Sequence, residues 1–203
     1  MKNGKFIVIE GGDGAGKSSQ CRLLAERLIN SGTDAIVTRE PGGAPLAEAL
    51  RSLILDPKYS PDAVAELYLY SAARRDHMNA VIIPALNAGK TVVCDRFIYS
   101  TVAYQGYGRG LDIDFVREVN AKTIAPLAVD LALFVDVPPA VAFERKGGAD
   151  KTDRLESEQA DFYERIYQGF NAMCESGELL RIDASGKKEE TAEKIYAAVK
   201  RIL

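Results

Sequence analysis

The sequence predicts an α/β fold, a five-stranded parallel sheet flanked by helices, on three observations. Short runs of β-branched and apolar residues alternate along the chain with longer stretches of helical periodicity, and strands joined through helices run parallel in their sheet. The chain has 203 residues, of which 47% are hydrophobic, and this length supports one compact domain over 1–203. A glycine-rich segment joins the first strand to the first helix, at the edge where open parallel sheets bind ligands.

Five short apolar segments have the β-branched character of buried strands. They are Lys5–Glu10, Ala35–Thr38, Thr91–Cys94, Leu131–Val137 and Leu179–Ile182. Each is followed by turn-forming residues or by a helical stretch. Because parallel strands end at the same edge of a sheet, we expect the residues that follow them to lie near one another.

The stretches between the strands have helical periodicity. Gly32 ends the first of them, and Pro45 suits the first turn of the second. Pro84 is expected to kink the last turns of the long third helix, because proline lacks the N–H of the helical hydrogen bond. The predicted helices are Lys17–Ser31, Pro45–Leu55, Asp62–Ala88, Asp114–Ala121, Pro139–Lys146, Leu155–Ser176 and Glu189–Ile202. Residues 146–153 are polar and contain glycine, which predicts a mobile connection between two helices.

Composition and charge exclude several classes of protein. The 26 basic and 29 acidic side chains give a formal net charge of −3, which argues against a nucleic-acid partner. His77 is the only histidine, so neither a Ser/His/Asp hydrolase nor a multi-histidine metal site is expected. Asp130 and Asp136 interrupt the longest apolar candidate for a membrane helix, and the N-terminal apolar run is too short for a signal peptide. Together with three cysteines that form no CxxC pair, these features predict a soluble cytoplasmic protein.

Residues 11–18 carry a phosphate-binding motif. They read GGDGAGKS and match the pattern G-x-x-x-x-G-K-[ST] between a strand and a helix. The glycines let backbone N–H groups surround phosphates at a helix N-terminus, Lys17 reaches the β- and γ-phosphates, and the Ser18 hydroxyl suits Mg²⁺. The alternative, a glycine-rich turn with an exposed lysine, does not account for the strand and the helix on either side. The motif predicts that ATP is bound by Gly11, Gly12, Asp13, Gly14, Ala15, Gly16, Lys17, Ser18 and Ser19.

Three arginines fall where the predicted sheet would bind a ligand. Arg39 follows the second strand, Arg74 lies on the long helix, and Arg96 comes at the end of the third strand. An arginine fork at this edge can hold a second phosphate group, which a hydrolase acting on water does not need. Taken singly, each is also compatible with a surface or salt-bridge arginine. Their shared edge favours an acceptor that already carries phosphate.

Aromatic and polar side chains accompany these arginines. Tyr70 and Arg74 are four residues apart and share a helix face, which offers a ring for stacking on a base beside a guanidinium. A tyrosine that fills the core is the alternative. Asp95 after an apolar strand resembles the acidic end of a Walker B strand, which helps to hold Mg²⁺. Side chains suited to base edges and sugar hydroxyls, or else to loop packing, follow at Ser100, Thr101, Tyr104 and Gln105.

Four segments in this order carry a more specific resemblance. They are the phosphate-binding loop, TREPGG at 38–43, DRF at 95–97 with Ser100 and AYQG at 103–106, and DRLE at 153–156. From Lys5 to about Ser185 the chain resembles the thymidylate kinase family. The resemblance implies the P-loop kinase fold with a short lid at about 145–154. It also implies transfer of the γ-phosphoryl group of ATP to dTMP with Mg²⁺, giving dTDP for dTTP synthesis, and a homodimer.

The same resemblance implies roles for individual residues. Tyr70 matches the aromatic residue that stacks on thymine, and Arg74 matches the arginine that contacts the base. Arg39 and Arg96 match the clamp on the dTMP phosphate. Asp13 matches an acid near the 3′-hydroxyl and the clamp, and Thr101 matches a polar contact to the base. Tyr104 matches a ring that disfavours a ribose 2′-hydroxyl, with Gln105 beside it. Residues 183–185 match the segment that flanks adenine.

Members of the family differ in whether the phosphate-binding loop or the lid supplies an extra catalytic cation. Gly14 occupies the loop position here, so the resemblance implies that the lid supplies it. The segment has fewer arginines than expected for such a lid, and a solvated loop without a catalytic part is the alternative. The catalytic candidates are therefore Lys17, Asp13 and Arg96 together with the lid cations Arg145, Lys146, Lys151 and Arg154.

Two other functions remain compatible with a phosphate-binding loop. One is a P-loop kinase for another nucleoside monophosphate or for a deoxynucleoside, and the other is a nucleotide-binding switch that phosphorylates no small molecule. Arg39 with Arg96 favours an acceptor that already bears phosphate. A switch would leave Tyr70, Arg74 and Tyr104 without a common purpose.

Overall fold

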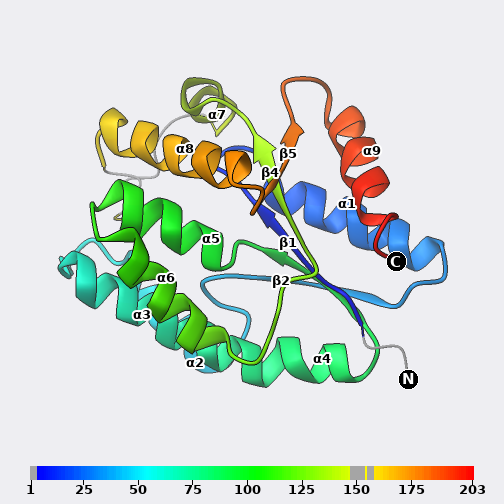
Figure 1. The fold of residues 1–203 in the computed structure, drawn as a ribbon, viewed down its shortest axis with the longest axis horizontal. Coiled ribbons are helices and arrows are strands. Elements are labelled where there is room, and N and C mark those ends of the chain that lie inside the picture. Colours follow the sequence, from blue (N-terminus) through cyan, green and yellow to red (C-terminus); the bar gives the residue numbers. More distant parts are fainter. Residues whose placement is uncertain (1–3, 147–153, 155–157) are drawn as a thin grey trace.

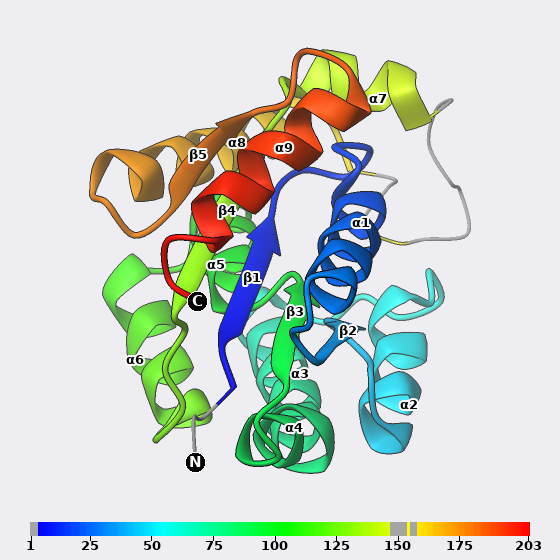
Figure 2. The same ribbon diagram turned by 90° about the vertical axis from the view of Figure 1, so that its right-hand side faces the viewer.

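The structure, a computed structural model, describes residues 4–146, 154 and 158–203. Five parallel strands form one sheet in the order β2-β3-β1-β4-β5 (Figure 1). The strands are β1 (Phe6–Glu10), β2 (Ala35–Arg39), β3 (Thr91–Asp95), β4 (Leu131–Asp136) and β5 (Leu180–Asp183). The predicted five-stranded parallel sheet is confirmed, and each strand lies within one residue of its predicted bounds. In Figure 2, β1, β3 and β4 run side by side in one direction.

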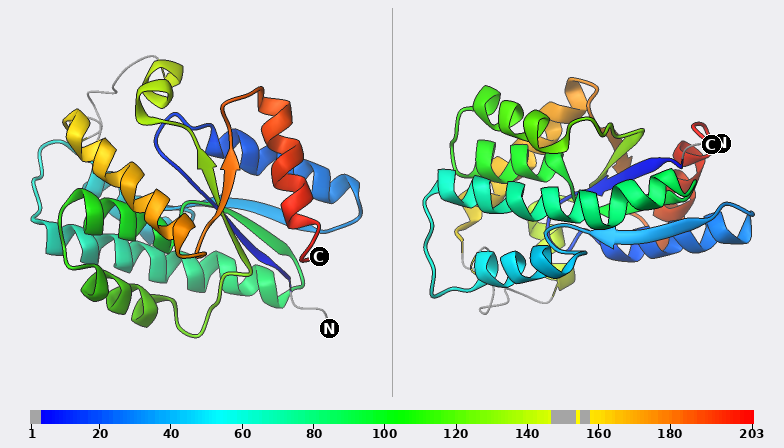
Figure 3. Two further views of the ribbon diagram at one scale, coloured as in Figure 1. Left: turned by 45° about the horizontal axis from the view of Figure 1, so that its top comes forward. Right: turned by 90° about the horizontal axis from the view of Figure 1, so that it is seen from below.

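Alternating side chains of the central strand build two cores. Phe6 and Val8 face one layer of helices, formed by α3 (Ala63–His77), α6 (Ile113–Ile124) and α8 (Ala160–Glu175). Ile7 and Ile9 face the other layer, formed by α1 (Lys17–Asn30) and α9 (Lys188–Val199). Both views in Figure 3 show helices on the two sides of the sheet. Because both faces are covered, β1 and β3 are buried along their whole length.

The helix boundaries follow local capping chemistry. Asp62 accepts a hydrogen bond from the Ala65 N–H at the start of α3, and Asp112 accepts one from the Phe115 N–H at the start of α6. Pro45 begins the second helix as predicted. Three further helices of the described chain are α2 (Pro45–Leu55), α5 (Ile98–Thr101) and α7 (Pro139–Lys146).

The long helix predicted over 62–88 is confirmed as a continuous helical stretch from Ala63 to Asn87, but its hydrogen-bond pattern changes along the way. After α3 the chain widens into a π-helical segment, η1 (Met78–Ile82), before α4 (Ile83–Asn87). Pro84 lies in the first turn of α4, directly after the π-helical segment. The physical reason is that a proline ring clashes with the carbonyl one turn upstream and removes an N–H, so the change in the hydrogen-bond ladder lies ahead of the proline.

A helical stretch that the sequence did not predict follows β3. It consists of α5 and the π-helical segment η2 (Val102–Gly108), and it places Tyr104 and Gln105 on a helix. Two glycines and several β-branched and aromatic residues give this stretch a weak helical propensity. It is stabilised by packing against α8 and α6, with all of η2 buried except Tyr107, so tertiary contacts determine its conformation.

Two other expectations concern chain segments beyond this framework. Most of the predicted mobile connection at 146–153 lies outside the described residues, and α8 begins at Ala160 where the sequence predicted Leu155. Among the described residues, none of the helices has the length and apolarity needed to cross a bilayer.

Candidate active site

The phosphate-binding loop connects β1 to α1 at the carboxyl end of the sheet. Gly16 has φ +88° directly before the first residue of α1, a conformation that side chains rarely adopt. A Cβ on Gly11 would lie 2.9 Å from the Val135 carbonyl oxygen, so the loop can pass close to β4 only with glycine there. The loop and the helix N-terminus have the geometry of an anion-binding site, as the motif predicts.

Lys17 is held over this loop by the chain itself. Its Nζ donates to the Gly12 carbonyl oxygen at 2.7 Å, and the side chain is buried. Burial lowers the pKa of Lys17 to about 8, and the positive charge of Arg96 lowers it as well. The carboxylates of Asp13, Asp95 and Glu10 act in the opposite direction and favour the charged lysine, which is the form that binds phosphate oxygens.

Ser18 and Asp95 bring two hard oxygen donors together. The Ser18 hydroxyl donates to Asp95 Oδ2 at 2.5 Å, although the two residues are far apart in sequence. A hydroxyl and a carboxylate beside a phosphate site are the donors that Mg²⁺ uses, with phosphate and water completing its shell. Among the described residues no group of three or more His, Cys, Asp or Glu side chains forms a metal cage. The donor set therefore fits a Mg²⁺ ion that arrives with nucleotide.

Asp13, Arg96 and Tyr104 form a hydrogen-bonded cluster beside the loop. Arg96 Nη2 donates to Asp13 Oδ1 at 2.6 Å and to the Tyr104 hydroxyl at 3.1 Å, and that hydroxyl donates to Asp13 Oδ2 at 3.1 Å. Burial by itself would raise the pKa of Asp13, but the charges of Arg96 and Lys17 hold it well below its usual value. Asp13 is therefore an ionised carboxylate that orients Arg96, and it is a poor general base.

Next to this cluster lies a pocket whose lining combines charge and aromatic surface. Tyr70 and Arg74 both line it, so the shared face predicted from their spacing is confirmed. Tyr70 is half-buried, with its ring available to the pocket. The predicted substrate-binding residues that line this pocket are Asp13, Tyr70, Arg74, Arg96, Ser100, Thr101, Tyr104 and Gln105.

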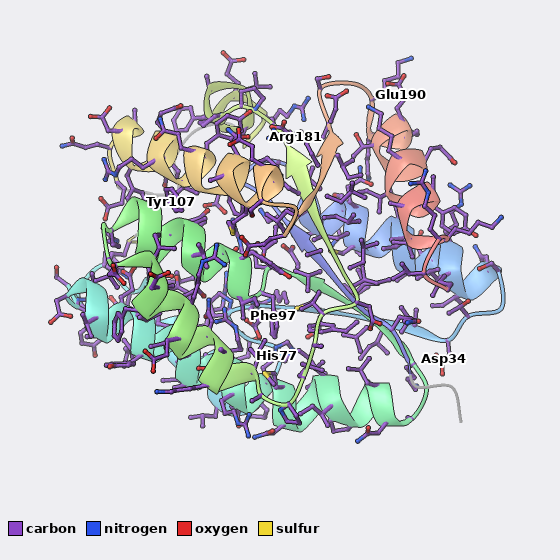
Figure 4. All side chains as sticks on the ribbon, in the orientation of Figure 1. Asp34, His77, Phe97, Tyr107, Arg181 and Glu190 are labelled. Atoms are coloured by element: carbon purple, nitrogen blue, oxygen red, sulfur yellow. The ribbon has the colours of Figure 1, made fainter. Side chains whose placement is uncertain are left out.

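Arg74 is fixed by a buried carboxylate that sequence reasoning missed. Glu40 Oε2 accepts from Arg74 Nε at 2.6 Å, and Glu40 Oε1 lies 3.1 Å from His77 Nδ1. His77 Nε2 in turn lies 2.6 Å from Thr38 Oγ1. A Cβ on Gly43, whose φ is +84°, would lie 2.5 Å from His77 Nε2, so the glycines of the TREPGG segment let it fold over the histidine. His77, which is labelled in Figure 4, is fully buried.

The other donors of Arg74 are also engaged. Nη1 donates to Asn120 Oδ1 at 3.1 Å and Nη2 to the Phe97 carbonyl oxygen at 3.2 Å. The guanidinium is thus held at once by the residue that follows β2, by α6 and by the segment after β3. An arginine restrained in this way presents its edge to the pocket in one orientation.

Arg39 does not line the pocket with Arg96 in this structure, so the predicted arginine pair on a phosphate stays a prediction. Arg39 Nη2 donates to both carboxylate oxygens of Glu48 at 3.0 and 3.1 Å, and its side chain is 46% exposed. Successive side chains of an extended strand point to opposite sides, so the inward position of Glu40 turns Arg39 outward. Arg51 of α2 lines the pocket, and its Nη1 donates to the Pro41 carbonyl oxygen at 3.0 Å. No local pattern in the sequence distinguishes Arg51 from a surface arginine.

The lid cations that the structure describes lie on two sides of the site. Arg145 Nη1 donates to the Ala184 carbonyl oxygen at 3.1 Å and lines a second hollow with Gly14, Gly16 and Gly186. The residues predicted to flank adenine therefore adjoin the phosphate-binding loop. The backbone of Lys146 ends α7, and Lys151 lies outside the described residues.

Arg154 lies beside the pocket that Tyr70 and Arg74 line, since its N–H donates to the carbonyl oxygen of Leu55 in that lining. Its Nη2 donates to Glu66 Oε2 at 2.5 Å, and its Nε donates to the Ile54 carbonyl oxygen at 3.0 Å. Glu66 is fully buried and also accepts from Gln105 Nε2 at 2.8 Å. Burial opposes ionisation of Glu66, but hydrogen bonds from Arg109, Gln105 and Arg154 lower its pKa below the usual value. Arg154 is thus joined to the wall of the acceptor pocket through Gln105.

Comparisons with known proteins agree with this geometry. Residues 9–195 match the model of a family described as "Thymidylate kinase". The chain is 45% identical to a thymidylate kinase of Psychrobacter sp. (strain PRwf-1), with 100% of both chains covered. It is 48% identical to one of Synechococcus sp. (strain JA-2-3B'a(2-13)), covering 96% of this chain and 93% of the relative. It is 43% identical to one of Halothermothrix orenii, covering 98% of each.

Proposed function

Because this chain belongs to the thymidylate kinase family, and so transfers the γ-phosphoryl group of ATP to dTMP, we propose which residues carry that reaction. The phosphate-binding loop takes ATP, and the pocket lined by Tyr70, Arg74 and Arg96 takes dTMP. The observation that carries this assignment is the Asp13–Arg96–Tyr104 cluster, which stands between loop and pocket. A phosphate group held by Arg96 lies next to the γ-phosphate of a nucleotide in the loop.

In the acceptor pocket the base and the phosphate are held by different groups. Tyr70 stacks on thymine, and Arg74 with Thr101 contacts the edge of the base. Arg96 binds the phosphate, with Ser100 beside it. Arg51 lines the same pocket and supplies a second positive charge that the sequence assigned to Arg39. Two arginines from different elements hold the acceptor oxygen in line without a strong base.

On the donor side the chain provides charge and hydrogen bonds for a triphosphate. Lys17 neutralises the β- and γ-phosphates, and the backbone N–H groups of residues 11–16 bind their oxygens. Mg²⁺, when bound with ATP, neutralises charge on the phosphates, and Ser18 and Asp95 are the residues that would hold it. Adenine lies in the hollow lined by Arg145, Ala184 and Gly186.

The lid candidates have different parts in this proposal. Arg145 lies beside the adenine hollow and Arg154 beside the acceptor pocket, so Arg154 is the described cation better placed to reach the transferred group. Closure of the lid over the two bound nucleotides excludes water and so suppresses ATP hydrolysis.

Two wider properties are part of the proposal. A homodimer is supported by the apolar side chains Val64 and Tyr68, which are 38% and 53% exposed on α3. A cytoplasmic location is supported by Cys21, Cys94 and Cys174, which are all free thiols. Sedimentation of the purified protein tests the dimer.

One experiment tests the substrate assignment against the alternatives. The protein is incubated with ATP, Mg²⁺ and a panel of nucleosides and nucleoside monophosphates, and the products are identified by mass. We expect dTDP and ADP in equal amounts. A new monophosphate from a nucleoside, a different diphosphate as the main product, or ADP without any phosphorylated acceptor would contradict the proposal.

A further inference from the structure

A fully buried carboxylate lies directly behind the proposed phosphate clamp. Glu10 ends β1, is 0% exposed and does not line the acceptor pocket. Its Oε1 accepts from the backbone N–H groups of Phe97 at 2.8 Å and Ser100 at 3.2 Å, and its Oε2 accepts from the Ser100 hydroxyl at 2.5 Å. Burying a carboxyl group costs free energy unless hydrogen bonds to the group offset that cost. All three of these hydrogen bonds go to the residues that follow Arg96.

Arg96 itself has an unusual backbone. Among the described residues it is the one non-glycine residue with positive φ, at +71°. Such a conformation in an arginine persists only where the surroundings impose it. Its N–H donates to the Ile9 carbonyl oxygen at 3.0 Å, and the next N–H, that of Phe97, donates to Glu10. The end of β1 therefore holds the strained residue from both sides.

A second route connects Glu10 to the guanidinium of Arg96. The Ser100 hydroxyl has one proton, and it donates that proton to Glu10. Its oxygen is then oriented to accept from Arg96 Nη1, which lies at 3.1 Å. Because an arginine can only donate, this direction is the one that lets Ser100 hold the guanidinium.

We propose that Glu10 is a positioning residue for the acceptor phosphate: through Phe97 and Ser100 it fixes both the strained backbone and the guanidinium of Arg96. The inference rests on the proposed role of Arg96 in dTMP binding and deepens it. Glu10 does not line the pocket, and its side-chain hydrogen bonds all go to Phe97 and Ser100 on the acceptor side. Its charge acts on Lys17 only as the smallest of the causes that set the pKa of that lysine, so we expect its main effect on dTMP.

If Glu10 had a purely structural role, its replacement would affect the two substrates differently from what the proposal expects. Glu10 also accepts the N–H groups of Phe97, the N-cap of α5, and of Ser100 in its first turn, so its removal could simply destabilise that helix. Loss of the helix would impair ATP and dTMP use together. Ser100 and Thr101 lie in α5, and Tyr104 of the following segment η2 pairs with Asp13 of the phosphate-binding loop. The two roles are separated by comparing the KM values for the two substrates.

The test uses Glu10→Gln, Ser100→Ala and the double variant in the full-length protein. Gln keeps the size of the side chain, but its amide offers an N–H to Ser100 and so reverses that hydrogen bond. We expect each single change to raise the KM for dTMP by about tenfold or more, with the KM for ATP changed less than about twofold. If both residues act by one route, the double variant raises the KM for dTMP by less than the product of the two single-variant increases.

Ser71→Ala is the matched control, because it also removes one buried serine hydroxyl, whose hydrogen bond goes to the Leu67 carbonyl oxygen. It is expected to leave both KM values unchanged. Thermal unfolding is measured for every variant. If Glu10→Gln does not fold, Glu10→Asp keeps the carboxyl group, shortens the reach by one methylene and is expected to raise the KM for dTMP in the same selective way.

The inference is overturned if Ser100→Ala raises the KM for dTMP while the Glu10 variants do not, because Ser100 then acts on substrate directly. It is also overturned if the Glu10 variants raise both KM values equally, or if the effects of the two residues multiply. The parent protein is assayed alongside with dTMP. Absence of dTDP formation by the parent would refute the proposed substrate, whereas failure of the inference affects the variants alone.

Discussion

The buried pair between Glu40 and Arg74 allows a quantitative prediction. Glu40 Oε2 and Arg74 Nε are 2.6 Å apart, and the two side chains are 4% and 2% exposed. Replacing Glu40 with Gln removes the negative charge and leaves a buried guanidinium without a counter-ion. Removing one partner of a buried pair costs about 3–5 kcal/mol of the free energy of unfolding.

The structure indicates where in this range the change falls. Gln retains an oxygen that can accept from Arg74, and the guanidinium keeps its bonds to Asn120 and to the Phe97 carbonyl oxygen. We therefore expect Glu40→Gln to cost about 3 kcal/mol and Glu40→Ala about 5 kcal/mol. For a chain of this length the smaller loss lowers Tm by about 6–12 °C.

The assay is urea unfolding monitored by circular dichroism. The free energies of unfolding are compared with the same dependence on urea concentration for all variants. Glu193→Gln is the control, since it removes one carboxylate from an exposed pair with Arg27 and is expected to change the stability little. The KM for dTMP should rise in the Glu40 variants because Arg74 loses its fixed orientation. The reasoning is refuted if Glu40→Gln costs no more than Glu193→Gln.

Further predictions concern the substrates, the lid and pH. Lys17→Ala should nearly abolish turnover, because the buried lysine is the main positive charge of the loop; steady-state kinetics measures this. Arg74→Ala should raise the KM for dTMP far more than the KM for ATP, since Arg74 lines only the acceptor pocket among the hollows described. Replacing the lid cations singly should lower kcat most at one position, for which Arg154 is our first candidate among Arg145, Lys146, Lys151 and Arg154. Burial raises the pKa of Glu10 from 4.5 to about 7, so its contribution to stability is fully present below pH 4.5 and is lost as the pH rises through about 7. This loss amounts to about 3 kcal/mol in the parent and is absent from Glu10→Gln, as unfolding at a series of pH values would show.

Each of these has an outcome that contradicts it. A Lys17→Ala variant with near-parental turnover would remove the phosphate role of the loop. Equal losses for both substrates in Arg74→Ala would place that residue outside the acceptor site. Unchanged kcat in all the lid variants would favour a solvated loop. Parallel stability curves for the parent and Glu10→Gln between pH 4.5 and 7 would show that the carboxyl group does not titrate in that range.

Much of the fold follows from local patterns. The five strands were predicted within one residue because each is a short apolar or β-branched run, and this character is local. The stretch 98–108 was missed for the opposite reason. Its residues have little helical propensity, and packing against α8 and α6 stabilises the helix.

The sequence by itself determined the parallel sheet, the phosphate-binding loop at its edge and the shared face of Tyr70 and Arg74, because each depends on spacing along a few turns of chain. Only the tertiary structure decided which charged side chains enter the site. Arg39 turns outward to Glu48 while Arg51 lines the pocket, and Glu10 meets Ser100 across 90 residues of chain. Side-chain direction at a strand end and the burial of a carboxylate depend on neighbours that are distant in sequence, and no local pattern encodes them.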